Sequence, residues 1–171
     1  MNKVYLIGFM GVGKSSIGKK LAQELGYNFI DLDDAFEKKY KISIHRFFEK
    51  YGEELFRELE YQLLTSTFKI SNVVVATGGG TVCYHDAMGQ MNLNGLTVYL
   101  KMPVGGIVER LKNVQRKRPL ITGKNETELL NTIIERLDNR LPYYQMAGIT
   151  LDVIDIDMTE LVERIKKEHN E

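Results

Sequence analysis

The sequence predicts a three-layer α/β fold in which helices cover both faces of a five-stranded, mainly parallel sheet. Short runs rich in Val, Ile, Leu and Tyr alternate with longer helical stretches, as in strands joined by crossover helices. Several runs are apolar almost throughout, as expected of strands that are covered on both faces. A glycine-rich segment directly after the first run is typical of a tight turn between a strand and a helix.

Five segments are expected to form strands and seven to form helices. The expected strands are residues 4–8, 28–32, 73–77, 97–101 and 149–154. The expected helices are residues 14–25, 34–41, 44–51, 53–70, 104–112, 126–141 and 158–168. Local signals at helix ends support these boundaries: capping-box spacing at Asn125 and Asp157, a terminating glycine at Gly26 and a first-turn proline at Pro103.

Length and composition fit a single domain spanning residues 1–171. Lys plus Arg and Asp plus Glu both number 23, so the chain has no global basic field and a dedicated nucleic-acid binder is not favoured. Cys83 is the one cysteine, which excludes an intrachain disulfide. The first expected strand begins at Val4 and no apolar run has the length of a membrane span, so we expect a cytoplasmic protein.

The glycine-rich segment lies between the first expected strand and the first expected helix. Residues 8–15, GFMGVGKS, match the pattern G-x-x-x-x-G-K-[ST]. In that pattern the glycines let successive backbone N–H groups converge on phosphate oxygens, and the following helix adds its N-terminal dipole. The ammonium of Lys14 can reach the outer phosphates, and the hydroxyl of Ser15 can coordinate Mg²⁺. The segment therefore predicts a binding site for a nucleoside triphosphate.

The motif alone leaves two classes of enzyme open. A switch or motor ATPase passes the phosphoryl group to water, whereas a small-molecule kinase passes it to a bound acceptor. The chain is short for the extra strands and partner-sensing elements of a large motor ATPase. The guanine-specifying pattern N-K-x-D does not occur in the sequence, so a GTPase is not favoured either.

Two acidic residues, Asp31 and Asp33, are expected to close the second strand. Residues two apart in an extended chain point to the same face, so both carboxylates are expected to project at the carboxyl edge of the sheet. One can support Mg²⁺ through water, and the other can accept the proton of an attacking hydroxyl. The alternative is that Asp33 or Asp34 caps the next helix, a role that suits Asp34 well.

Glycine and arginine residues elsewhere are compatible with contacts to an acidic acceptor. Gly78, Gly79 and Gly80 follow the third expected strand, where bare backbone can approach a carboxylate or hydroxyl. Arg57, Arg118 and Arg140 lie on separate elements, and a guanidinium binds carboxylate or phosphate through a planar fork. The residues alone leave a flexible turn and solvated surface arginines as alternatives. His45, His85 and His169 have no metal-ligand spacing.

The segment spanning residues 112–124 interrupts the regular alternation of strands and helices. It is polar and basic, contains Arg118 before Pro119, and carries Gly123 near its end. Between two expected helices, a segment of this composition predicts a mobile lid.

Six segments taken together resemble the shikimate kinase family, and the resemblance runs through nearly the whole chain. They are residues 8–15, 29–33, 52–57, 77–80 and 118–120, and the pair Arg140 and Tyr143. The resemblance implies transfer of a phosphoryl group from MgATP to the 3-hydroxyl of shikimate, within the route to chorismate and aromatic amino acids. It also implies a sheet of the nucleoside-monophosphate-kinase type with strand order 2-3-1-4-5. Beside the resemblance, we expect a monomer whose partners are shikimate and ATP, with neither nucleic acid nor membrane among them.

The resemblance also assigns roles to individual residues. Asp33 holds and activates the attacking hydroxyl, and Ser15 and Asp31 hold Mg²⁺. The shikimate carboxylate is bound by Arg57 and Arg140, and the acceptor-binding region spans residues 33–61. The same pocket is lined by Gly78, Gly79, Gly80, Glu60, Phe48 and Phe56. The nucleotide contacts are Gly11, Val12, Gly13, Lys14, Ser15, Ser16, Arg110 beside adenine, and Arg118 from the closing lid.

Two rival functions remain open beside this resemblance. Another small P-loop kinase, for gluconate or a nucleoside monophosphate, would carry the same phosphate loop but a different acceptor pocket. A catalytically silent paralogue would bind ligand and signal or scaffold, although the presence of Lys14, Asp33 and Arg118 counts against it. The chain departs from the family pattern at residues 155–157, where relatives often carry Arg or Pro, so adenine contacts there are expected from the backbone.

Overall fold

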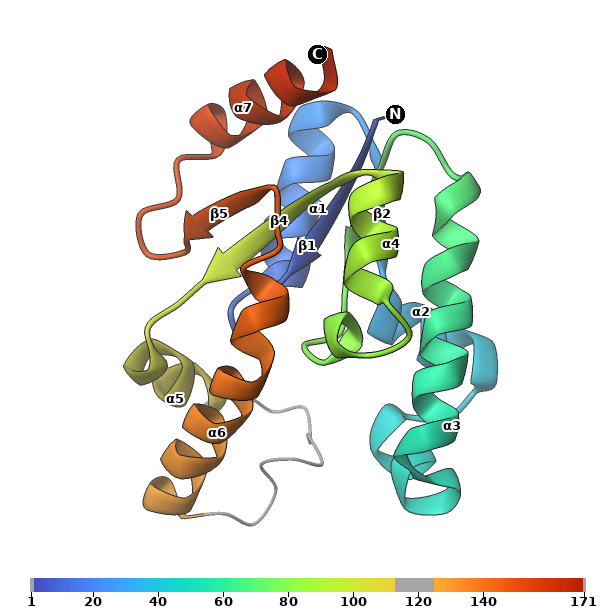
Figure 1. Cartoon of the computed structure of the whole chain (residues 1–171), viewed down its shortest axis with the longest axis vertical. Helices are drawn as coiled ribbons and strands as arrows, with labels where there is room; N and C mark the ends of the chain where they lie inside the picture. Colours follow the sequence, from blue (N-terminus) through green and yellow to red (C-terminus); the bar gives the residue numbers. More distant parts are fainter. Residues whose placement is uncertain (1, 113–124, 171) are drawn as a thin grey trace.

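A five-stranded parallel sheet forms the centre of the protein (Figure 1). The computed structural model describes residues 2–112 and 125–170. The strand order β2-β3-β1-β4-β5, with parallel pairing between all neighbours, confirms the predicted topology. The strands are β1 (Lys3–Ile7), β2 (Asn28–Asp31), β3 (Val73–Ala76), β4 (Leu96–Lys101) and β5 (Ile149–Asp152).

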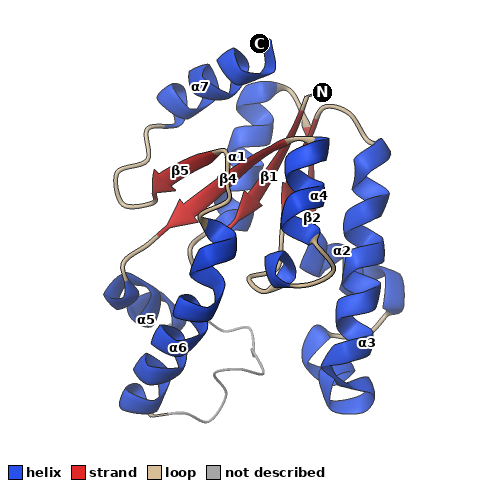
Figure 2. Cartoon of the chain, viewed as in Figure 1, coloured by secondary structure: helices blue, strands red, loops and turns tan. Residues whose placement is uncertain are grey.

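Helices lie on both faces of the sheet, as Figure 2 shows. The α-helices are α1 (Lys14–Leu25), α2 (Leu32–Tyr40), α3 (Ile44–Ser66), α4 (Ala87–Asn94), α5 (Val104–Lys112), α6 (Glu126–Tyr144) and α7 (Met158–Asn170). Two short 3-10 helices, η1 (Thr67–Lys69) and η2 (Thr81–Cys83), flank β3. No helix in the described part of the chain has the length and apolar composition needed to cross a membrane.

The core is divided by the sheet into two layers of apolar side chains. Alternate residues of β1 face opposite sides: Val4 and Leu6 belong to one cluster, and Tyr5 and Ile7 to the other. The first cluster is completed by buried residues of α1, α5, α6 and α7, and the second by buried residues of α3, α4 and α6. This two-sided burial explains why the strands read as continuous apolar runs rather than as alternating patterns.

The end of β2 differs from the prediction in a way that matters for the site. The strand stops at Asp31 instead of residue 32, and α2 begins at Leu32 instead of residue 34. The cause is the Asp31 side chain, which caps α2 by accepting the backbone N–H groups of Asp33 (3.0 Å) and Asp34 (3.3 Å). Asp33 therefore lies in the first helical turn. The prediction that strand alternation aligns Asp31 with Asp33 was wrong, and the cap is Asp31 rather than Asp33 or Asp34 of the alternative interpretation.

Other boundaries depart from prediction for local reasons. The expected helices 44–51 and 53–70 form one element, α3, with a kink at Gly52 (φ 82°, ψ 171°) that replaces the expected gap. Helix α4 was not predicted, because its short sequence AMGQMNLN contains a glycine and has no clear apolar stripe. Helix α6 continues three residues beyond the expected end, through Pro142, because a proline in the last turn removes few backbone hydrogen bonds.

Candidate active site

The loop between β1 and α1 is built by backbone geometry. Gly11 (φ 82°) and Gly13 (φ 99°) adopt the left-handed region that side chains disfavour, and Gly13 is the residue before the first turn of α1. The ammonium of Lys14 lies across the loop and donates to the carbonyl oxygens of Gly8 and Phe9, both at 2.8 Å. The loop thus combines a helix N-terminus with a fixed cation, which is an arrangement suited to phosphate.

The two residues predicted to hold a metal ion lie side by side. The hydroxyl of Ser15 donates to one carboxylate oxygen of Asp31, and the other oxygen of Asp31 caps α2. Among the described residues, no three or more His, Cys, Asp or Glu side chains are grouped to hold a metal ion. An ion bound here would therefore depend on ligands beyond the protein, as Mg²⁺ does when phosphates supply part of its coordination.

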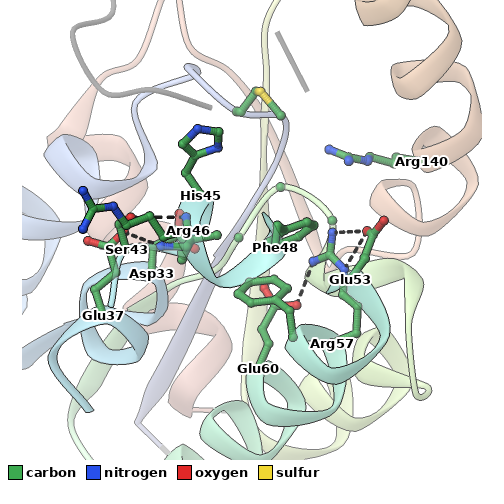
Figure 3. Close-up of a pocket in the computed structure, with 16 residues that line it drawn as sticks. Asp33, Glu37, Ser43, His45, Arg46, Phe48, Glu53, Arg57, Glu60 and Arg140 are labelled. Carbon is green, nitrogen blue, oxygen red and sulfur yellow. Dashed lines mark hydrogen bonds and ion pairs between the residues drawn. The ribbon is translucent and has the colours of Figure 1, made fainter. Parts of the chain in front are cut away.

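Two cavities open on either side of Asp33. The smaller, here called the loop cavity, has a volume of about 190 Å³ and is lined by Gly11, Gly13, Lys14, Ser15, Ser16 and Asp31. The larger, here called the large cavity, has a volume of about 430 Å³, and its lining includes Phe48, Phe56, Arg57, Glu60, Gly80 and Arg140 (Figure 3). Asp33, Gly78 and Gly79 line both. The two predicted halves of the site therefore share one wall.

The position of that wall follows from the sheet register. Asp31 of β2 pairs with Ala76 of β3, so α2 and the glycine segment begin next to each other at the carboxyl edge. A side-chain carbon at Gly78 would lie 2.6 Å from Glu60 Oε1 and 3.3 Å from Asp33 Oδ1. A glycine is needed at this point because the backbone passes directly against both carboxylates.

Arg57 is held in place by two carboxylates. Its Nη1 donates to Glu60 at 2.8 Å, and its Nε and Nη2 donate to one oxygen of Glu53 at 3.2 and 3.0 Å. Burial alone would lower the pKa of Arg57, but the charge of Glu60 and the hydrogen bonds that Arg57 donates to both glutamates raise it above its ordinary value. Within the described residues these bonds use three of the five guanidinium N–H donors, so two remain for a ligand.

Arg140 extends from α6 and lines the large cavity together with Arg57, on the same side of the view in Figure 3. The residue is 6% exposed, and its Nη1 is buried without a hydrogen-bond partner among the described residues. Its guanidinium carbon is 5.2 Å from the ring centroid of Phe9. A buried donor of this kind is costly unless a ligand completes it. Of the two arginines, Arg140 is therefore the one that a bound anion would stabilise more.

Aromatic and polar residues complete the large cavity. Phe48 and Phe56 form the expected apolar wall, with ring centroids 4.7 Å apart. Sequence reasoning missed several residues that line the cavity or support it. Those that line the cavity are Met10, Glu37, Ser43, Ile44, His45, Arg46 and Glu53. Thr81 supports it from outside by donating to Glu60 at 2.6 Å.

Tyr144 supports the glycine segment from the opposite side. Its hydroxyl donates to the carbonyl oxygen of Gly79 at 2.6 Å, and its ring stacks on Tyr99 with centroids 4.9 Å apart. Burial raises the pKa of Tyr144, so the hydroxyl stays protonated and remains a donor at neutral pH. No sequence motif indicated this residue, because its partner is a backbone carbonyl 65 positions away.

The predicted nucleotide contacts fall into three groups. Gly11, Gly13, Lys14, Ser15 and Ser16 line the loop cavity, whereas the side chain of Val12 is buried in the core. The guanidinium of Arg110 donates to the carbonyl oxygen of Val12 at 2.9 Å, so it lies against the loop. Stacking of Arg110 on adenine stays a prediction. Arg118 and residues 113–124 of the expected lid lie outside the described residues.

Comparison with known proteins identifies the family. The sequence pattern of the family described as shikimate kinase matches residues 10–170. The chain belongs to the shikimate kinase family. A shikimate kinase from Parabacteroides distasonis is 41% identical over 152 residues, which cover 89% of this chain and 88% of the relative. The family resemblance predicted from the six segments is thus confirmed.

Solved structures of shikimate kinases share the fold over almost the whole chain. The enzyme from Bacteroides thetaiotaomicron superposes with a TM-score of 0.90 at 33% identity, covering 99% of each chain. Shikimate kinase from Acinetobacter baumannii, solved in complex with shikimate, superposes with a TM-score of 0.86 at 31% identity. That match covers 98% of this chain and 92% of the other. The predicted P-loop kinase fold is therefore confirmed.

Proposed function

We propose that this protein transfers the γ-phosphoryl group of ATP to the 3-hydroxyl of shikimate, giving shikimate 3-phosphate and ADP. Family membership supports an ATP-dependent kinase. The observation that carries the proposal is the wall shared by the two cavities, which places Asp33 between the phosphate loop and the large cavity. A kinase needs this arrangement, because donor and acceptor must meet while water is kept away.

The loop cavity is the proposed site of the triphosphate. Backbone N–H groups of the loop and the ammonium of Lys14 bind the β- and γ-phosphates, with Gly11, Val12, Gly13 and Ser16 supplying the loop. Ser15 and Asp31 fit Mg²⁺, because they present adjacent oxygen ligands and a phosphate-bound ion keeps few protein ligands. When bound, Mg²⁺ neutralises developing charge on the phosphate oxygens.

The large cavity is the proposed site of shikimate, formed largely by the region of residues 33–61. Arg140 and Arg57 bind the carboxylate, Arg140 through the buried Nη1 donor and Arg57 through the two N–H groups that its glutamates leave over. The ring lies against Phe48 and Phe56, and its hydroxyls face Glu60 and the glycine segment.

The chemical step needs one base and positive charge from the protein. Asp33 accepts the proton of the 3-hydroxyl as that oxygen attacks the γ-phosphorus, and the bond between the γ-phosphorus and the β-γ bridging oxygen breaks to release ADP. Lys14 stabilises the charge that develops on the phosphoryl oxygens. Arg118, which lies outside the described residues, is proposed to add a second positive charge from the lid.

A coupled assay for ADP release tests the proposal. The protein is supplied with ATP, Mg²⁺ and, in separate reactions, shikimate, gluconate and a nucleoside monophosphate. We expect turnover with shikimate and none above the hydrolysis background with the other two acceptors. Turnover of gluconate or the nucleotide with shikimate untouched would contradict the substrate, and ATP binding without any turnover would favour a silent paralogue. Monomeric state and cytoplasmic location stay predictions, testable by light scattering and by cell fractionation.

A further inference from the structure

Tyr84 packs against the guanidinium of Arg57 but does not line the large cavity. The guanidinium carbon of Arg57 is 4.6 Å from the ring centroid of Tyr84 and 5.1 Å from that of Phe56. Phe56 lines the cavity, whereas Tyr84 does not. The guanidinium is therefore close to two aromatic rings, and one of them belongs to a different segment of the chain.

The hydroxyl of Tyr84 also reaches the carboxylate that orients Arg57. It donates to Glu53 Oε1 at 3.3 Å, and the same oxygen accepts both Nε and Nη2 of Arg57. Glu53 is only partly buried, with a side chain that is 40% exposed, so water competes for this oxygen. The ring of Tyr84 packs on the guanidinium, and its hydroxyl donates to the Glu53 carboxylate. Both contacts restrict the access of water to this ion pair.

The backbone around Tyr84 fixes where the ring lies. Tyr84 directly follows η2, and its N–H donates to the carbonyl oxygen of Thr81. The next two residues, His85 (φ 52°) and Asp86 (φ 55°), both have left-handed backbone conformations that non-glycine residues rarely adopt. The His85 ring packs on Tyr61 of α3, with centroids 5.2 Å apart. The turn thus anchors Tyr84 against the helix that carries Arg57.

We propose that Tyr84 is a positioning residue for Arg57, and that it raises affinity for the acceptor without touching it. The inference rests on the proposed function, because it assumes that Arg57 binds the shikimate carboxylate. Tyr84 and Glu53 hold the guanidinium plane so that the two remaining N–H donors face the large cavity. Without Tyr84 the plane can tilt toward solvent, and each binding event must then order the guanidinium again.

Steady-state kinetics of Tyr84→Phe and Tyr84→Ala test the inference. Tyr84→Ala removes both the ring and the hydroxyl. It should raise KM for shikimate about 10-fold, while KM for ATP and kcat stay near their wild-type values. Tyr84→Phe keeps the ring and should raise KM for shikimate about 2-fold. The control is Leu93→Ala, which removes an apolar side chain that is 72% exposed on α4 and lines neither cavity, and it should leave both KM values unchanged.

A double-mutant cycle with Arg57→Lys shows whether Tyr84 acts through Arg57. Lysine cannot reproduce the planar fork, so Tyr84→Ala should add little to the loss that Arg57→Lys alone causes. Calorimetric titration with shikimate should show the same non-additivity in Kd. Melting temperatures of all variants report whether a loss reflects folding, and Tyr84→Phe serves where Tyr84→Ala is unstable.

Two outcomes would overturn the inference while leaving the proposed function intact. In one, wild type phosphorylates shikimate but Tyr84→Ala raises KM for ATP as much as KM for shikimate. In the other, the losses from Tyr84→Ala and Arg57→Lys simply add. If wild type does not phosphorylate shikimate at all, the proposed function fails first, so the two failures are distinguishable.

Discussion

The loop cavity and the large cavity meet at Asp33 but are built in different ways. Half of the residues that line the loop cavity come from one continuous segment, residues 11–16, whose geometry comes from left-handed glycines and a helix N-terminus. The large cavity takes charged side chains from three separate helices, α2, α3 and α6, and its lining also includes the glycine segment that follows β3. One half of the site is a backbone structure, and the other is an arrangement of buried charges.

This difference determines how each half should respond to substitution. The loop contributes many similar backbone N–H groups, which side-chain substitutions leave in place. The substitution that should lower activity most is therefore at Lys14, the side chain that supplies charge. The large cavity relies on a few charged groups in fixed positions, so each of Arg57, Arg140 and Glu60 should matter, and mainly for acceptor binding. Substitutions should therefore separate effects on kcat from effects on KM for shikimate.

The largest effect is expected at Lys14. Replacing the ammonium by an apolar side chain of similar length, Lys14→Met, should lower kcat about 10³-fold, because it removes charge stabilisation of the transferring phosphoryl group. Lys20→Met on the exposed face of α1 is the matched control and should retain wild-type kcat. Equal kcat values for the two variants would remove Lys14 from the mechanism. The measurement is initial ADP release at saturating ATP and shikimate.

A smaller effect, confined to the acceptor, is expected at Arg140. Arg140→Met removes the buried Nη1 donor and should raise KM for shikimate about 30-fold, as the loss of charge-assisted hydrogen bonds predicts. KM for ATP should change little. Arg136→Met, one turn earlier on α6 and absent from the cavity lining, is the control. A rise in KM for ATP as large as that for shikimate would erase the distinction between the two halves.

A still smaller effect is expected from one added carbon at Gly80. A side-chain carbon there would lie 2.6 Å from Nη2 of Arg57, so Gly80→Ala must displace the guanidinium. We expect KM for shikimate to rise about 10-fold, equivalent to the loss of one hydrogen bond to a charged group. Gly105→Ala meets no atom within 4 Å and should leave both KM values unchanged. Unchanged shikimate kinetics in Gly80→Ala would show that Arg57 need not be fixed.

The sequence predicted the loop half of the site better than the large cavity. The pattern at residues 8–15 is local, and it implies its own backbone geometry wherever a strand precedes and a helix follows. The strand order and the family were also predicted, and both were confirmed. The family was inferred from six short contiguous segments, and the strand order followed from that resemblance, whereas the alternation of strands and helices indicated the parallel sheet.

The contacts that organise the large cavity could not be predicted in the same way. The bond from Thr81 to Glu60 joins residues 21 positions apart, and that from Tyr84 to Glu53 joins residues 31 apart. No local pattern encodes such pairs, because they arise where separate elements pack together. The wrong boundary at Asp31 has a related cause: a carboxylate in the loop can end a strand or cap a helix, and tertiary placement decides between them.

Asp33 is where the two halves meet, and a single comparison there tests the account most directly. Asp33→Asn keeps the shape of the side chain and removes the base, so kcat should fall at least about 10²-fold. Calorimetry should show that ATP and shikimate still bind the variant with near wild-type Kd. Asp34→Asn, at the neighbouring exposed residue, is the control and should retain wild-type turnover. Near-normal kcat in Asp33→Asn would contradict the proposal that phosphoryl transfer takes place at the wall between the two cavities.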